Sequence, residues 1–146
     1  MHIEIREQAF DPWQTLAHYQ ESRAGLHGKF GATASFVGTM RDFNEGDSVQ
    51  GMTLEHYPAM TERHLQHILT AAHERWPLLD ALVVHRVGRL QPHDPIVLVA
   101  VWTAHRGAAF EACRFIMEDL KHKAPFWKQE SLDDGQQRWV ERNTAG

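Results

Sequence analysis

The stretch ALVVHRVGRLQPHDPIVLVAVWTA, residues 81–104, decides the fold of this chain of 146 residues. It contains two apolar runs, residues 81–90 and 96–104, whose aliphatic and β-branched side chains are typical of buried strands. The connector between them, residues 91–95, consists largely of turn-forming residues and predicts a hairpin turn. We therefore expect two neighbouring strands at the centre of the fold, followed by a helix over residues 108–122.

The rest of the chain continues this alternation of strands and helices. Asp11 and Pro12 predict a helix start, because Asp is a good N-cap and Pro suits the first helical position. The other expected elements are strands at residues 3–5, 32–39 and 49–57, a polar loop at residues 40–50, and a helix from Pro58 to Pro77. The predicted fold is one α+β domain over residues 1–146, with a mixed or antiparallel sheet packed against about three helices.

Composition and charge exclude several classes of protein. Hydrophobic residues make up 42% of the chain and charged residues 23%, as in ordinary globular proteins. The formal net charge of -4 disfavours nucleic-acid binding through a basic surface, so any anion site must be local. No apolar run approaches the roughly 20 residues of a membrane span, and the first residues lack the apolar core of a signal peptide. We therefore expect a cytoplasmic protein without membrane contact.

Cys113 is the only cysteine of the chain, which excludes an intramolecular disulfide and a thiolate metal cage. It lies in the expected third helix among Phe110, Ala112, Ile116 and Met117, which predicts a small buried side chain. A catalytic thiol is the alternative, although no activating residue adjoins it in the sequence.

Eleven histidines raise the alternative of a metal site. His64 and His67 lie three residues apart in the expected second helix and His73 follows, but a His-Glu-x-x-His motif and a third ligand at a useful spacing are absent. Phosphate-binding glycine loops and the Gly-x-Ser-x-Gly motif are absent as well. Neither a metal nor a bound cofactor is expected.

Residues 121–130, KHKAPFWKQE, combine three lysines with a proline and two aromatic residues. This mixture suits the wall of a pocket, where apolar groups fix the geometry and ammonium groups meet an anion. Strand alternation would place Lys128 on one face with Phe126 and Glu130. The alternative for Lys128 is a surface ion pair with Glu130.

The expected third helix indicates where Lys121 points. Phe110, Arg114, Met117 and Lys121 are spaced four, three and four residues apart, so they share one helix face. An ammonium group partly removed from water there could act as an acid or a base near neutral pH. The alternative is a solvated lysine that complements the helix dipole at the C-terminus.

Three further side chains are candidates for an anion site. His105 and Arg106 follow the strand at residues 96–104 and precede the third helix, a position suited to a ligand cleft. Arg106 can offer two parallel donors to a phosphate, and His105 can add a hydrogen bond or a proton. Arg41, in the polar loop, is the third candidate, with a solvated loop cation as the alternative.

His85 and Arg86 form a second His-Arg pair, inside an expected strand. Alternation sends the two side chains to opposite faces, so at most one of them can serve a given site. We expect a structural role for this pair.

Several short motifs, in order along nearly the whole chain, resemble the large, catalytic subunit of molybdopterin synthase. Each motif is weak alone, and their order in a chain of this length makes the resemblance specific. The matching pieces are Phe36-Val37-Gly38-Thr39-Met40-Arg41, Leu54-Glu55-His56-Tyr57 with Met60, His85-Arg86-Val87-Gly88, His105-Arg106 with Ala109-Phe110, Lys121 through Pro125-Phe126-Trp127-Lys128-Gln129-Glu130, and Trp139.

The resemblance implies an α/β hammerhead fold and a sulfurtransferase activity in molybdenum cofactor biosynthesis. The family installs two dithiolene sulfurs on cyclic pyranopterin monophosphate, which becomes molybdopterin. The sulfur arrives as a thiocarboxylate on the C-terminal Gly-Gly tail of a small ubiquitin-like partner. The implied assembly is a heterotetramer, in which a central homodimer of this subunit carries one small subunit on each outer side.

The resemblance also implies roles for seven residues. Lys121 and Lys128 match the two active-site lysines of the family: Lys121 in proton transfer or in holding intermediates, and Lys128 in stabilising the tail terminus and developing negative charge. The five implied substrate-binding residues are Arg41, His105 and Arg106 toward the anionic substrate, and Phe36 and Met117 as apolar walls. A basic residue near the C-terminus, Arg138 or Arg142, is implied to reach a neighbouring protomer.

Two other classes of function stay open from the sequence. A non-catalytic module that binds an anion or a nucleotide would explain the arginines and histidines, but it leaves the paired lysines beside Pro125-Phe126-Trp127 unexplained. An interaction subunit whose groove only receives a peptide tail is the second alternative. Catalytic turnover separates the enzyme from both.

Overall fold

The computed structural model describes residues 1–44, 46–123 and 126–140. Its larger sheet has four strands in the order β1-β5-β7-β2. The β1 and β5 strands are parallel, whereas β7 is antiparallel to both β5 and β2, so this sheet is mixed. The bounds of these strands are β1 His2–Arg6, β2 Ala32–Thr39, β5 Leu78–Arg86 and β7 Pro95–Thr103.

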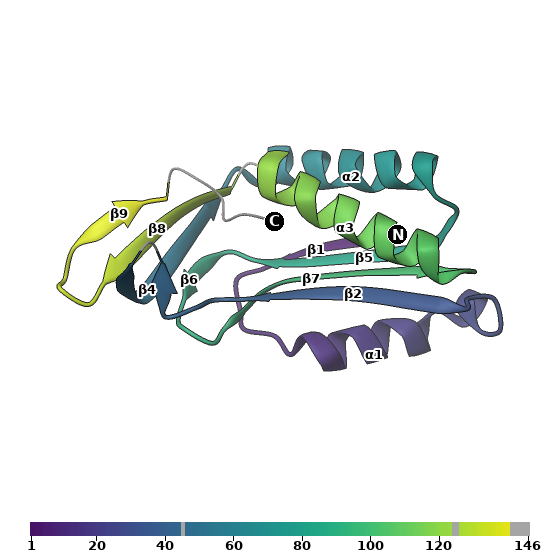
Figure 1. Cartoon of the computed structure of the whole chain (residues 1–146), viewed down its shortest axis with the longest axis horizontal. Coiled ribbons are helices and arrows are strands. Elements are labelled where there is room, and N and C mark those ends of the chain that lie inside the picture. Colours follow the sequence, from purple (N-terminus) through teal and green to yellow (C-terminus); the bar gives the residue numbers. More distant parts are fainter. Residues whose placement is uncertain (45, 124–125, 141–146) are drawn as a thin grey trace.

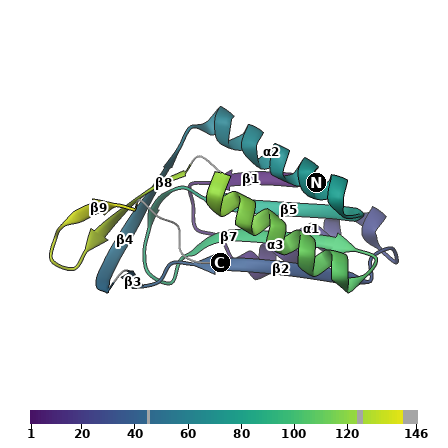
Figure 2. The same ribbon diagram turned by 45° about the horizontal axis from the view of Figure 1, so that its top comes forward.

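Three helices cover the larger sheet, α2 and α3 on one face and α1 on the other (Figures 1 and 2). Asp11 caps α1 as expected, because its carboxylate accepts from the backbone N–H groups of Trp13 and Gln14 at 2.9 and 3.3 Å. The bounds are α1 Pro12–Ser22, followed by a 3-10 turn at Ala24–Leu26, then α2 Pro58–Arg75 and α3 Arg106–Lys123. The predicted α+β class with about three helices is confirmed.

The two central strands divide their side chains between two cores. In β7, Val97, Val99 and Val101 pack with α2 and α3, while Leu98 and Trp102 pack on the side of α1. The same alternation in β5 places His85 on the face of α2 and α3 and Arg86 on the face of α1. Both faces are apolar because both are covered, which explains the continuous apolar runs in the sequence.

A smaller antiparallel sheet stands beside one end of the larger one (Figure 1). Its strand order is β3-β4-β8-β9, and β6 also pairs with β4. The bounds are β3 Phe43–Asn44, β4 Asp47–His56, β6 Gly88–Leu90, β8 Phe126–Leu132 and β9 Gln137–Trp139. A third apolar cluster, which includes Met40, Val49, Met52, Leu54, Leu90 and Leu132, lies under this sheet.

Two local predictions were wrong. The expected polar loop at residues 40–50 contains β3 and the start of β4, which pair as a hairpin. The expected single strand at residues 81–90 is broken, because Gly88 adopts a φ of 84°, a left-handed conformation that ends β5. The chain then crosses to the smaller sheet as β6, so residues 91–95 connect two sheets and do not form a simple hairpin turn.

The turn at residues 91–95 is tied to the end of β2. The backbone N–H of Met40 donates to the Asp94 carbonyl at 2.9 Å, and the N–H of His93 donates to the Met40 carbonyl at 2.8 Å. These two bonds fix the chain where it leaves β2 toward Arg41. Across the three described ranges, no helix has the length and apolar character that a bilayer crossing requires.

Candidate active site

A cleft of about 1300 Å³ runs along β2 and α3 and ends at β8. One wall is β2 from Thr33 onward, together with Met40 and Arg41. The volume exceeds the ~300–1,000 Å³ of most small-molecule pockets, so the cleft has room for more than one small ligand.

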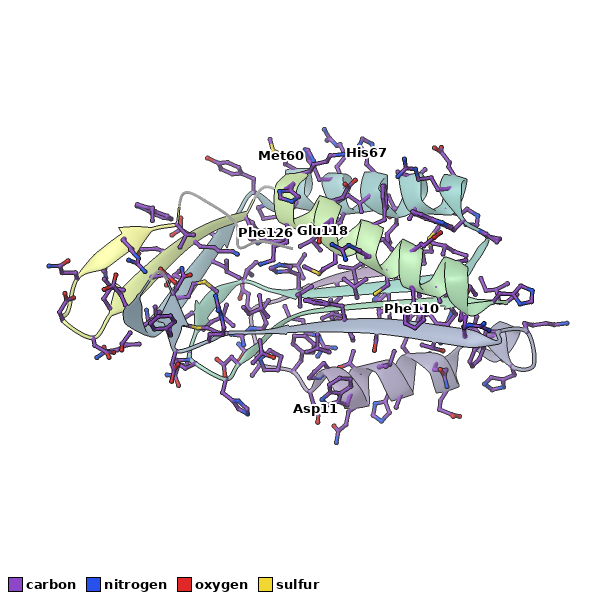
Figure 3. All side chains as sticks on the ribbon, in the orientation of Figure 1. Asp11, Met60, His67, Phe110, Glu118 and Phe126 are labelled. Carbon is purple, nitrogen blue, oxygen red and sulfur yellow. The ribbon has the colours of Figure 1, made fainter. Side chains whose placement is uncertain are left out.

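The predicted face of α3 forms the second wall. Phe110, Arg114, Met117 and Lys121 all line the cleft, which confirms that they share one helix face. Phe110 is largely exposed, whereas Met117, His85 and Glu130 are buried. The cleft is therefore more deeply buried toward Lys121, at the end that is called closed here. Phe110 is labelled in Figure 3 near the start of α3.

Lys121 and Lys128 come together at the closed end of this cleft. Lys121 lies in the last turn of α3, and Lys128 lies on β8 opposite Leu54 of β4. The pKa of Lys128 is lowered to about 8, mainly by burial and also by the positive charge and the hydrogen bond of Lys121, while Glu130 acts in the opposite direction. Lys128 therefore holds both its ammonium and its amine form in appreciable amounts near pH 8.

Phe126, Lys128 and Glu130 line the same cleft, as alternation along one strand predicts. Glu130 is only 5% exposed and accepts from Asn44 Nδ2 at 3.0 Å and Arg138 Nε at 2.9 Å. The sequence alternative of a surface pair between Lys128 and Glu130 is therefore wrong, because neither residue is at an open surface. Glu130 is a cleft residue that the sequence did not indicate, since there it was considered only as the partner of Lys128 in a surface pair.

Arg138 links its own strand, β9, to three other strands of the smaller sheet, β8, β4 and β3. Besides its bond to Glu130, it donates to Asp47 Oδ2 at 2.7 Å and to the Asn44 carbonyl at 2.8 Å. These bonds bind its guanidinium within its own chain, which leaves a role in a neighbouring protomer without support here. Arg142, the other candidate for that role, lies outside the described residues.

His85 is the second cleft residue that sequence reasoning undervalued. It lies at the end of β5, is 4% exposed and lines the cleft near the lysines. Its pKa is lowered to about 4, mainly by burial and also by the charges of Lys128, Lys121 and His56, against the opposing effect of its bond to the Arg86 backbone. Alternation predicted that at most one of the pair His85 and Arg86 serves the site, but it did not indicate which one.

Phe36 and Arg41, the two predicted substrate contacts on the β2 side, line the cleft together with Met117. Phe36 is 40% exposed, so a large apolar surface is open to a ligand there. Gly38 lies between them, and a Cβ at this position would press against the Val97 side chain, so a glycine keeps β2 close to β7.

His105 and Arg106 do not line this cleft. They lie at the start of α3, and Lys121 lies fifteen residues further along the helix, about 22 Å away at 1.5 Å per residue. A single chain therefore does not bring them to the two lysines, and their role in binding the substrate stays a prediction. The strand end and the helix start were predicted correctly, but the ligand cleft lies at the other end of the helix.

Cys113 also lines the cleft, yet its side chain is 7% exposed and burial raises the pKa of its thiol to about 11. A thiol with this pKa carries almost no thiolate at neutral pH, which speaks against a nucleophilic role. Within the described residues, His, Cys, Asp and Glu side chains form no group of three that could hold a metal ion.

The fold and the cleft define a class of protein. It is an α+β chain with a second, smaller sheet, in which Lys128 of that sheet and Lys121 of α3 line one long cleft. A family model described as MoaE protein matches residues 5–123, which include Lys121 and end before Lys128. The chain belongs to this family.

Curated relatives and solved structures agree with this membership. The chain is 52% identical over 139 residues to the molybdopterin synthase catalytic subunit of Ralstonia nicotianae, covering 95% of this chain and 76% of the relative. It is 50% identical to the molybdopterin synthase catalytic subunit of Pseudomonas aeruginosa, covering 97% and 91%. The crystal structure of molybdopterin synthase from Staphylococcus aureus matches with a TM-score of 0.83 at 31% identity, covering 95% and 96%.

Proposed function

We propose that this chain is the catalytic subunit of a molybdopterin synthase. It would transfer sulfur from the C-terminal thiocarboxylate of a small ubiquitin-like partner to cyclic pyranopterin monophosphate and so form the dithiolene of molybdopterin. The names of the relatives support this activity. The observation that carries it in the structure is the meeting of Lys121 and Lys128 at the closed end of one cleft.

The lysine pair suits the chemistry of this reaction. Each transfer exchanges oxygen for sulfur without a change of oxidation state. On the substrate a carbon–sulfur bond forms and a carbon–oxygen bond breaks, while the carbon–sulfur bond of the tail breaks and oxygen takes its place, so the tail leaves as a carboxylate. Anionic sulfur and oxygen species are present throughout, and two partly desolvated ammonium groups stabilise such charge well. Because the pKa of Lys128 is about 8, this residue can also accept and return protons near neutral pH.

The remaining cleft residues would position the substrate. Arg41 would hold the phosphate, since a guanidinium offers parallel donors to its oxygens. Phe36 and Met117 would pack against the pterin ring from the two walls. His105 and Arg106 stay in the proposal only for an assembly in which a second copy of the chain brings them to this cleft.

The dimensions of the cleft support a protein partner besides the small molecule. A pterin phosphate alone would leave part of about 1300 Å³ empty, and a narrow peptide tail could occupy the rest. We therefore keep the small sulfur-carrier subunit as the proposed partner, in a heterotetramer around a central homodimer. The proposed location of this assembly is the cytoplasm.

A reconstituted assay tests the function. The purified chain is mixed with a thiocarboxylated small subunit and cyclic pyranopterin monophosphate, and the dithiolene product is measured. We expect product from wild type and losses of at least ~100-fold for Lys121→Ala and Lys128→Ala, because each removes charge stabilisation and proton transfer.

Lys123→Ala is the matched control for this assay. Lys123 lies on the same helix, is exposed, and pairs with Asp119 at 3.2 Å away from the cleft, so its loss should leave turnover unchanged. Absence of product from wild type, with a formed complex and an active control enzyme, would leave a binding protein and would contradict the proposal.

A further inference from the structure

His85 contacts the site through an aromatic stack. The ring of Phe126 lies 4.0 Å from that of His85, with 10° between their planes. The ring of His56 also lies against that of Phe126, with 6.1 Å between the centroids and 27° between the planes. The three rings belong to β5, β8 and β4, so the stack joins the larger sheet to the smaller one; Figure 3 labels Phe126 at this junction.

The stack acts on the strand that carries Lys128. Phe126 is the first residue of β8, and Lys128 follows two positions later on the same face. His56 is the direct cross-strand neighbour of Phe126, and its Nδ1 lies 3.3 Å from Thr61 Oγ1 in the first turn of α2. Two imidazoles therefore pack on the Phe126 ring at the start of β8, one from the end of β5 and one from the end of β4.

The protonation state of His85 follows from its hydrogen bond. Nδ1 lies 2.7 Å from the carbonyl oxygen of Arg86, and a carbonyl oxygen can only accept. Nδ1 therefore carries the proton of a neutral ring. A neutral ring suits its position, because a charged His85 would add a third cation beside Lys121 and Lys128.

We propose that His85 is a positioning residue for the lysine pair: it stays neutral, protonated at Nδ1, and through its stack on Phe126 it holds Lys128 against Lys121. The inference rests on the proposed function only for its effect on turnover. Its geometric part concerns the environment of Lys128 and can be measured without any substrate.

Two substitutions separate the stack from the volume of the side chain. His85→Phe keeps a flat, neutral ring on Phe126, whereas His85→Leu keeps an apolar side chain and loses the stacking geometry. We expect His85→Leu to lower kcat at least tenfold and His85→Phe to stay within threefold of wild type. His67→Leu is the matched control, because His67 is exposed on α2 and does not line the cleft (Figure 3).

Titration of the lysine side chains by heteronuclear NMR measures the pKa of Lys128. If His85 only stabilised the fold, its replacement would leave this pKa unchanged. In His85→Leu, the ammonium group of Lys128 should become more exposed to solvent, and its pKa should rise from about 8 toward the ordinary lysine value. In His85→Phe it should stay near the wild-type value. The groups that face His85 and also enter this titration are Lys121, Lys128 and His56.

The outcomes are distinct. A folded His85→Leu with wild-type kcat and an unchanged Lys128 titration would overturn the proposal, as would His85→Phe being as impaired as His85→Leu. Nitrogen shifts showing wild-type His85 charged at pH 6, or protonated at Nε2, would also overturn it, and they need no variant to fold. An inactive wild type with the expected lysine titrations would refute the proposed function and leave the positioning role standing.

Discussion

Burial of a charged ammonium group lowers the free energy of unfolding, and Lys128 is such a group at the closed end of the cleft. Its neighbours offer little compensation, because Lys121 adds a second positive charge and Glu130 is already engaged by Asn44 and Arg138. A side chain kept in such an environment indicates selection for chemistry at the expense of stability.

Replacement of Lys128 by Met should therefore stabilise the folded chain while it abolishes turnover. At pH 7 we expect the free energy of unfolding to rise by ~1–2 kcal/mol, less than the full pKa difference implies because Lys128 is only partly buried. Denaturant unfolding of the two proteins measures the difference, with Lys123→Met as the surface control.

The pH dependence of that difference has a definite sign. The pKa of Lys128 is about 8 in the folded chain against 10.5 ordinarily, so the unfolded chain binds the proton more tightly. The penalty is complete below pH 8 and disappears as the pH rises toward 10.5. The gain from Lys128→Met should shrink over this window, and a gain that stays constant or grows would contradict the burial of this group.

At the scale of secondary-structure elements, the turn at residues 91–95 and the smaller sheet fix the ends of the cleft. His93 in this turn has a φ of 78°, a left-handed conformation that a residue with a Cβ adopts only at a cost. Its backbone N–H donates to Met40, so the turn is held in this shape by the end of β2.

His93→Gly should relieve this strain. We expect the free energy of unfolding to rise by about 0.5–1 kcal/mol, since glycine tolerates positive φ but loses more chain entropy on folding. His93→Ala keeps the Cβ and should change little, which makes it the paired control in thermal and denaturant unfolding. A less stable His93→Gly than His93→Ala would show that the turn is not strained.

The network around Arg138 should behave as one unit across β3, β8 and β9. Arg138→Ala removes one of two partners from the buried Glu130 carboxylate and should lower the melting temperature by several degrees. In a Glu130→Gln background the same change should have a clearly smaller effect, because no buried charge is left uncompensated. Equal effects in both backgrounds would mean that the two residues are not coupled.

At the scale of the whole molecule, the features that could be predicted from the sequence are those that depend on neighbouring residues in the chain. The cap at Asp11, the apolar strands, the helix starts at Pro12 and Pro58 and the shared face of α3 all follow from periodicity and capping. The break at Gly88 did not, because a glycine in an apolar run gives no sign that the next residues join another sheet. The short strands β3 and β9 were missed for a similar reason, since their pairing depends on tertiary contacts.

The site shows the same division. Lys121, Lys128, Arg41, Phe36 and Met117 were predicted as site residues and all line one cleft. His85 was expected to have a structural role. Its place in the cleft could not be predicted, because it depends on which sheet face α3 covers, a property of the assembled layers. His105 and Arg106 were predicted from a strand end before a helix, a position that often lines a ligand cleft. Within one chain they lie at the other end of α3 from Lys121, and their role in binding the substrate stays a prediction.

The crowding of two cations in the cleft has a thermodynamic consequence for binding. An anion that enters between Lys121 and Lys128 favours the charged form of Lys128, so complex formation should draw protons from the solution. Proton uptake by Lys128 should approach about half a proton per site at pH 8 and fall to about a tenth at pH 7, because its pKa is about 8 before the anion binds. Calorimetric titration in buffers of different ionisation enthalpy would measure it, with inorganic phosphate as the first anion. Through this linkage, the pH of the solution and the concentration of the anion both control the same equilibrium, the protonation of Lys128.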